Sequence, residues 1–201
     1  MSMEMPWPAA SPLSATEVVN ALFALYRERG GTHYDASVTQ AEHALQSAAL
    51  AEAESAGDAL VVAALLHDIG HLLVDEHDGR GEFLAGDEQH ERIGARVLAP
   101  WFPAEVTGPI ALHVPAKRYL VATDPDYAAT LSDASTRSLA VQGGPMTDRQ
   151  ATTFSQQRFA DVACRLRRWD DRAKLADAGT PTFEHYGPAV ARMVRLREGT
   201  E

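Results

Sequence analysis

The stretch "VVAALLHDIGHLL", residues 61–73, decides the fold of this chain, because a histidine and an aspartate stand side by side within an apolar run. The run continues to Leu73 as though His67 and Asp68 were apolar. A helix that is apolar on nearly every face is buried, so we expect this segment at the centre of a helical domain. Burying a carboxylate beside an imidazole costs several kcal/mol unless a partner compensates both groups. The His67–Asp68 pair is therefore better explained as metal ligands than as structural residues.

The overall composition is typical of one globular domain. The chain has 201 residues, of which 45% are hydrophobic and 23% charged, as in ordinary globular proteins. Its net charge of -10 argues against general nucleic-acid binding, but not against a small basic pocket for an anionic metabolite. The single cysteine, Cys164, excludes an internal disulfide framework and fits a reducing cytoplasm. Neither a signal peptide nor a membrane span is expected, and nothing indicates the oligomeric state.

Apolar periodicity and capping residues predict helices along the whole chain, without a convincing strand. A capping box from Ser14 to Glu17 begins a helix over 14–29. Thr39 is expected to begin the next helix, which Gly57 ends, and Asp58 to cap the buried one. Later helices are predicted over 89–102, 104–113 with a break near Pro115 and a continuation through Tyr119, 126–142, from Asp148, 157–176 and 182–199.

The rest of the chain is expected to be irregular. Residues 1–12 are rich in Pro, Ser and Ala and are expected to be disordered, whereas 74–88 are expected to form a charged, glycine-bearing loop. Residues 13–197 are predicted to be a single all-α domain, because no repeat or linker divides them.

Several predicted helices carry a histidine or an aspartate among apolar neighbours. Ligands far apart in the sequence can share a metal when several helices point inward at one place. Histidine and carboxylate ligands together favour iron, manganese or zinc. A lone helical histidine is more often a core or surface residue, and His33, His77 and His185 are interpreted as surface residues. The candidate ligands are His43, His67, Asp68, His90, His113 and either Asp170 or Asp171.

The ordered pattern His43, His67–Asp68 and Asp170 resembles the HD-domain superfamily of metal-dependent phosphohydrolases. His90 and His113 match its dinuclear branch. The resemblance implies an all-α HD-domain helical bundle with a dinuclear metal site in its core.

A narrower resemblance covers residues 34–186. The stretches "VTQAEHALQSAALAE", "AALLHDIGHLL", "HERIGARVLAPWFP", "LHVPAKRYL", "YAATLSDASTRSLAVQGGPM" and "LRRWDDRAK" are similar to the mixed-valent diiron oxygenases that cleave 1-hydroxy-phosphonates. These enzymes are relatives of myo-inositol oxygenase. The resemblance implies two iron ions in an Fe(II)/Fe(III) pair, O2 as co-substrate, an anionic phosphonate substrate, and release of phosphate and a carboxylic acid.

The resemblance also implies roles for individual residues. One iron would be held by His43, His67, Asp68 and Asp170, and the other by Asp68, His90 and His113. Asp170 is preferred to Asp171 because Lys174 follows it by four residues, as in the related oxygenases. Catalytic roles fall to His71 and Lys117, and the substrate contacts implied are Tyr34, Asp35, His71, Lys117, Ser135 and Arg167.

The loop before His43 departs from the family pattern. The phosphonate-cleaving members carry a tyrosine and, three residues later, a glutamate that occupies the iron until substrate arrives. Here Tyr34 is shifted by one position and position 36 is alanine. Either Asp35 replaces the missing carboxylate or the site has none.

Three alternatives stay open at this point. A metal-dependent phosphohydrolase acting on a phosphate ester or nucleotide would use the same ligands, and a degenerate HD module would bind without catalysis. Lys117 and "SLAVQGGPM" match the oxygenases. As a third alternative, Lys117 and Arg167 can be ordinary surface charges that take no part in binding.

The sequence does not identify the substituent of the substrate. A quaternary amine there would need an aromatic cage, for which the candidates are Tyr34, Tyr119, Tyr127 and Trp169.

Overall fold

The computed structural model describes residues 14–35, 37–73 and 89–195. All its regular elements in these ranges are helices, apart from an isolated β-bridge between His33 and Thr39, so the predicted all-α class is confirmed. The helices are α1 (Ala15–Arg29), α2 (Gln40–Ala53), α3 (Asp58–Leu66), α4 (Ile69–Leu73), α5 (His90–Leu98), α6 (Ala104–Thr123), α7 (Pro125–Ala129), α8 (Asp133–Val141), α9 (Asp148–Ser155), α10 (Ala160–Arg172) and α11 (Phe183–Met193).

The first helices begin where their capping residues predict. Ser14 and Thr39 each form a complete capping box, with Glu17 and Glu42 respectively. Two boundaries differ from the prediction. Helix α2 ends at Ala53, ahead of the predicted stop at Gly57, and Asp58 is the first residue of α3 rather than its cap, because Gly57 takes the extended N-cap conformation.

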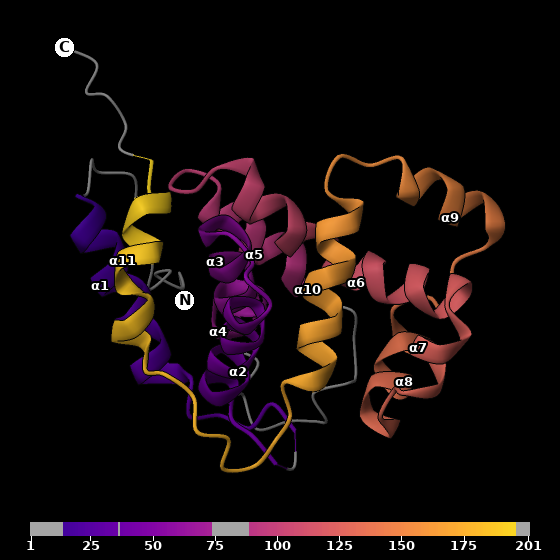
Figure 1. Cartoon of the computed structure of the whole chain (residues 1–201), viewed down its shortest axis with the longest axis horizontal. Coiled ribbons are helices and arrows are strands. Elements are labelled where there is room, and N and C mark those ends of the chain that lie inside the picture. The colour runs from indigo at the N-terminus through magenta and orange to yellow at the C-terminus, as the bar shows by residue number, and fades with distance from the viewer. Residues whose placement is uncertain (1–13, 36, 74–88, 196–201) are drawn as a thin grey trace, which may run out of the picture.

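The stretch 61–73 lies at the centre of the molecule, as its apolar sequence predicts. Residues Leu60–Leu66 of α3 are all buried, and α3 packs against α2, α6, α10 and α11. Figure 1 shows α3 between the α1–α11 pair on one side and α10 on the other. His67 and Asp68 occupy the turn between α3 and α4, so the two polar side chains stand where one helix ends and the next begins.

Helix α6 contradicts the predicted break near Pro115. It runs without interruption from Ala104 to Thr123, with Pro109 and Pro115 inside it. An internal proline costs a helix about 3 kcal/mol. Here Val114 and Ala116 on either side of Pro115 are buried, and α6 packs along α5 and α10. Tertiary packing therefore outweighs the local cost, which keeps His113 and Lys117 on one continuous helix.

The C-terminal half shows further differences. The helix predicted over 126–142 is two helices, α7 and α8, because Asp124 and Ser132 each cap a new helix start. Gly143 and Gly144 follow α8 with φ of 96° and 68°, which supports the predicted stop. Helices α10 and α11 are shorter than the predicted 157–176 and 182–199.

Two glycines allow α4 and α5 to approach closely. A Cβ atom on Gly70 would lie 2.1 Å from the His90 carbonyl oxygen, and one on Gly94 would lie 3.2 Å from the Gly70 nitrogen. A side chain at position 70 would therefore push the start of α5 away. The glycine of "HDIGH" thus sets the position of His90 relative to Asp68.

The expectations for residues 1–12, for Ala36 and for the loop 74–88 with His77 concern residues outside those described. The single domain over 13–197 stays a prediction. Across the described ranges, every helix is too short or too polar to cross a bilayer.

Candidate metal centre

Four helices and one turn bring the six candidate ligands together. His43 comes from α2, His90 from α5, His113 from α6 and Asp170 from α10, while His67 and Asp68 lie between α3 and α4. All six are buried. The structure therefore gathers residues that are distant in the sequence at one place in the core.

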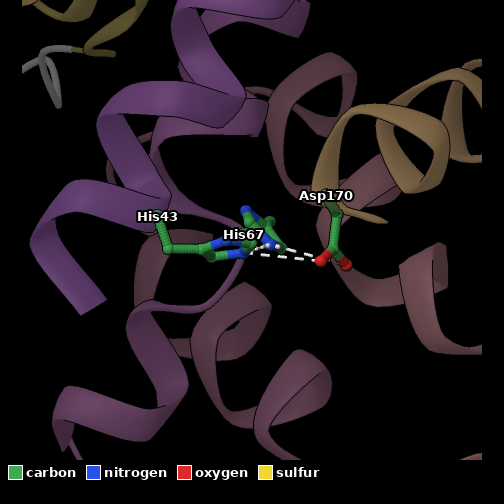
Figure 2. A group of neighbouring side chains, drawn as sticks. All are labelled: His43, His67 and Asp170. Atoms are coloured by element: carbon green, nitrogen blue, oxygen red, sulfur yellow. Dashed lines mark hydrogen bonds and ion pairs between the residues drawn. The ribbon is translucent and has the colours of Figure 1, made fainter. Parts of the chain in front are cut away.

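One half of this cluster consists of His43, His67 and Asp170, which Figure 2 shows pointing toward one another. The Nε2 atoms of His43 and His67 lie 3.2 Å apart. Asp170 places Oδ1 3.4 Å from His43 Nε2 and Oδ2 3.6 Å from His67 Nε2. These atoms form a compact set of donors of the kind that holds a transition metal.

The other half consists of His90 and His113, whose Nε2 atoms also lie 3.2 Å apart. Asp68 lies between the halves. Its Oδ2 is 3.4 Å from His67 Nε2 and 3.6 Å from His43 Nε2. Its Oδ1 is 3.3 Å from His90 Nε2 and 3.4 Å from His113 Nε2. The two oxygens of one carboxylate thus face two separate histidine pairs, which is the arrangement of a carboxylate that bridges two metals.

Hydrogen bonds fix the tautomers of three of these histidines. The Nδ1 atoms of His43, His67 and His113 lie 2.8, 2.9 and 2.8 Å from the carbonyl oxygens of Ala173, Ala64 and Ile110. A carbonyl only accepts, so each Nδ1 carries a hydrogen and each neutral ring presents a bare Nε2 lone pair. Two such lone pairs 3.2 Å apart, as in His43 and His67, cannot bond to each other. A cation between them satisfies both, so the residues fit a metal.

The charges around the site also fit a cation. Burial opposes ionisation of Asp68, but the nearby histidines hold the pKa of its carboxyl well below the ordinary value. Burial alone would lower the pKa of His67, but Asp68 and Asp170 raise it to about 9. Burial and the neighbouring His71 lower the pKa of His90 to about 3. Without a metal, a proton on His67 partly neutralises the carboxylates, and a bound metal would replace it.

Arg167 lies against the carboxylates of α10. Its Nη1 is 2.6 Å from Asp170 Oδ2, and its Nε donates to Asp171 Oδ2 at 2.9 Å. Tyr127 also donates a hydrogen bond to Asp171. The structure thus separates the two aspartates, because Asp170 faces the histidines while Asp171 lies among Arg167, Tyr127 and Ser135.

Lys117 and Arg167 are both buried, so the alternative that they are surface charges is wrong. The ammonium of Lys117 donates to Ser138 Oγ at 2.6 Å. Burial, together with the charge of Arg167, lowers the pKa of Lys117 to about 7. Ser135 accepts a hydrogen bond of 2.9 Å from Lys174 and donates one of 3.2 Å to Asp171. Among the described residues, the cations Lys117, Arg167 and Lys174 therefore lie close to one another beside the cluster.

The loop before α2 contributes Tyr34 to the cluster. Its ring stacks on His43, with centroids 3.7 Å apart and planes 8° apart, and its hydroxyl donates to Asp170 Oδ1 at 3.2 Å. Asp35, in contrast to Tyr34, makes its contacts within its own loop. Its Oδ1 accepts from the backbone amides of Ser37 and Val38 at 2.7 and 3.0 Å, so this carboxylate closes its own loop.

The other residues singled out in the sequence lie in three places: beside the cluster, in the core, or on the surface. His71 is partly buried and stacks on His90, with ring centroids 3.9 Å apart. Of the residues proposed for an aromatic cage, Trp169 is buried in the main core and Tyr119 packs on Phe154. His33 is exposed, and His185 pairs with Glu52 on the surface, as expected.

The sequence analysis did not predict the roles of Lys174, which lies beside the cluster, and of Gln46, which holds the segment around it. The Gln46 carboxamide donates to the Leu175 carbonyl at 2.9 Å and accepts from the Leu175 amide at 3.0 Å. It thereby fixes the segment that carries Lys174. Gln46 stands three residues after His43 and so shares its helical face, which was a usable signal because a polar side chain on an inward face needs partners.

Comparisons with known proteins agree with this geometry. A family model described as "HD domain" matches residues 41–131, a range that includes every candidate ligand except Asp170. The chain is 52% identical to hydroxymethylphosphonate dioxygenase of Gimesia maris over 174 residues, which are 87% of each chain. It is 39% identical over 199 residues, 97% of this chain and 100% of the relative, to [1-hydroxy-2-(trimethylamino)ethyl]phosphonate dioxygenase (glycine-betaine-forming) of Leisingera caerulea. An uncharacterised protein of Acanthamoeba polyphaga mimivirus is 35% identical over 84% of this chain and 78% of its own.

Proposed function

The chain belongs to the HD-domain superfamily and, within it, to the phosphonate oxygenases, and on this premise we propose that it uses O2 to cleave the carbon–phosphorus bond of a small 1-hydroxy-phosphonate. The products are phosphate and a carboxylic acid. The observation that carries the proposal is the orientation of Asp68, whose two oxygens face the His43–His67 and His90–His113 pairs. A mononuclear site needs no such arrangement.

We propose iron as the metal at both positions, in the mixed-valent Fe(II)/Fe(III) state. One ion would be held by His43, His67, Asp68 and Asp170, and the other by Asp68, His90 and His113. Bound iron would supply the activation of O2 and the polarisation of the substrate's hydroxyl and phosphonate oxygens. The second set has fewer protein ligands, which leaves more positions for small molecules.

The chain's own residues bind and orient the substrate. A phosphonate carries up to two negative charges, and Lys117 and Arg167 are the buried cations beside Asp170. Charge-assisted hydrogen bonds from these cations would hold the phosphonate. Arg167 also fixes the orientation of Asp170, and the apolar wall from α3 keeps bulk water from the centre. His71, stacked on His90, borders the second position, where it can donate to or accept from the substrate.

The reaction balances without a further reductant. The hydroxylated carbon of the substrate loses its hydrogen and its bond to phosphorus and becomes a carboxyl carbon, which releases four electrons. One molecule of O2 accepts four electrons. Carbon and phosphorus each gain one oxygen atom, so hydroxymethylphosphonate and O2 yield formate and phosphate.

The test measures phosphate release and O2 consumption by the iron-loaded protein with 1-hydroxy-phosphonates. We expect one phosphate released for each O2 consumed, and no release under anaerobic conditions. Asp68→Asn is the inactive control. Undiminished turnover without O2, or release of phosphate from phosphate esters by the manganese, nickel or zinc protein alone, would establish the hydrolase instead. The cytoplasmic location stays a prediction.

A further inference from the structure

We propose that Lys174 is a specificity-determining residue, which selects 1-hydroxy-phosphonates with no charge on the substituent over those with a cationic one. This inference rests on the proposed function and deepens it, because it names the substrate class that the site prefers. Three observations support it: Lys174 lies over the Tyr34 ring, neighbouring residues hold it there, and the nearby carboxylates are already paired with other groups.

Lys174 covers the face of Tyr34 that is turned away from the metal cluster. One face of the Tyr34 ring stacks on His43, with 3.7 Å between ring centroids. Lys174 Nζ lies over the ring at 5.6 Å from its centroid. The His43 ring fills the first face, so the ammonium must lie over the second. A substrate cation that sought the π-face of Tyr34 would find it already occupied by a protein cation.

Two sets of contacts hold Lys174 in this place. The Gln46 carboxamide bonds both backbone groups of Leu175, and the Ala173 carbonyl accepts from His43, so α2 fixes the residues on each side of Lys174. The ammonium itself donates to Ser135 Oγ at 2.9 Å and lies 3.6 Å from Asp171 Oδ1. Lys174 is therefore positioned, rather than free to swing away from a ligand.

Of Lys117, Arg167 and Lys174, the cations that the described ranges place at the site, Lys174 is the most exposed. Its side chain is 15% exposed, whereas that of Arg167 is 5% exposed and Lys117 is almost fully buried. The phosphonate needs the inner cations and the metals, so the substituent on the carbon chain must extend outward. Tyr34 and Lys174 are both partly exposed and lie together on that outer side, so we place the substituent beside them.

Within the described ranges, the carboxylates beside Tyr34 and Lys174 are already paired, which leaves them little capacity to offset a positive substituent. Asp170 pairs with Arg167, and Asp171 is shared among Arg167, Tyr127, Ser135 and Lys174. Asp35 is turned to its own backbone amides. A trimethylammonium group would thus meet like charge at the outer edge of the site. Like charges a few ångströms apart at a protein surface reduce binding by at least about tenfold.

The experiment compares kcat/KM of the iron-loaded protein with three substrates. These are hydroxymethylphosphonate, 1-hydroxy-2-(trimethylamino)ethylphosphonate, and its uncharged isostere 1-hydroxy-3,3-dimethylbutylphosphonate, in which carbon replaces nitrogen. The isostere separates charge from size. We expect the uncharged isostere to exceed the cationic compound by at least about tenfold in the unaltered protein. In Lys174→Met this ratio should fall toward one, because kcat/KM for the cationic compound rises, while Lys174→Arg should preserve it.

The outcomes separate the proposals. An equal loss with all three substrates in Lys174→Met would mean that Lys174 binds the shared phosphonate, and would overturn the specificity role. Preference of the unaltered protein for the cationic compound would also overturn it, and would leave carbon–phosphorus cleavage intact. Release of phosphate from none of the three would refute the proposed function and the inference with it. Lys174→Gln, with folding checked by circular dichroism, repeats the test if the methionine variant does not fold.

Discussion

The two halves of the candidate metal centre differ in how firmly the protein holds their side chains. In the half made by His43, His67 and Asp170, both histidines donate from Nδ1 to backbone carbonyls, Arg167 pairs with the carboxylate, and Tyr34 stacks on His43. In the other half His113 also donates from Nδ1 to a backbone carbonyl, but His90 is the first residue of α5, follows a residue with a left-handed backbone, and stacks on the partly buried His71. The first half is built as a rigid anchor, and the second as a more open position.

This difference suggests a division of labour. Ligands whose outer atoms are tied to the backbone keep their orientation, which raises metal affinity. A position with fewer ligands and a less buried neighbour is suited to exchange of small molecules. For the proposed dinuclear site, we therefore expect the ion at His90 and His113 to be the more easily lost.

The largest effect should come from Asp68, which the two halves share. Asp68→Asn removes the charge that faces both histidine pairs and keeps the size of the side chain. We expect loss of both metals and a fall in kcat/KM of roughly a thousandfold or more. Metal analysis of the purified variant measures the first effect, and phosphate release the second. Retention of two metals would show that Asp68 does not bridge.

A matched pair of histidine variants tests the asymmetry directly. His90→Ala should lose only the second metal and retain one ion per chain. His43→Ala should lose the anchoring ion and, with it, most of the second, because both share Asp68. Activity should fall about a hundredfold or more in each. Equal metal content in the two variants would contradict the rigid-anchor interpretation.

The close approach of α4 and α5 should matter more to the second half than to the first. In Gly70→Ala the new Cβ would overlap the His90 carbonyl, so α5 must shift. We expect a loss of about 3 kcal/mol in the free energy of unfolding, with loss of the His90 metal before the His43 metal. Gly179→Ala is the matched control, because nothing lies within 4 Å of its Cβ position. The comparison uses denaturant unfolding and metal content.

The smallest effect concerns Lys117, whose pKa burial lowers to about 7. The protonated ammonium is the form that attracts a phosphonate. Raising the pH through about 7 therefore removes the charge, and kcat/KM should fall up to about tenfold for each further pH unit. Lys117→Arg keeps its charge and should remove this decline. An unchanged alkaline limb in Lys117→Arg would assign the titration to another group.

The prediction of the fold succeeded at most positions where local chemistry decides, and it failed at α6, where packing decides. Capping residues located the starts of α1 and α2, and the apolar run located the central helix. The continuity of α6 through Pro115 depends instead on helices that pack against it, which no local rule contains. The division of 126–142 into two helices was foreseeable, because Ser132 is a typical helix-capping residue.

By itself, the sequence determined which residue types stand in apolar surroundings, and in what order, because burial of an unpaired histidine or aspartate is too costly to be accidental. It thereby indicated the ligand set before any geometry was known. Only the tertiary structure decided that Asp68 turns one oxygen toward each histidine pair, that Asp171 lies among Arg167 and Tyr127, and that Gln46 fixes Lys174 over Tyr34. These contacts join residues far apart in the chain, and their distances depend on how whole helices pack.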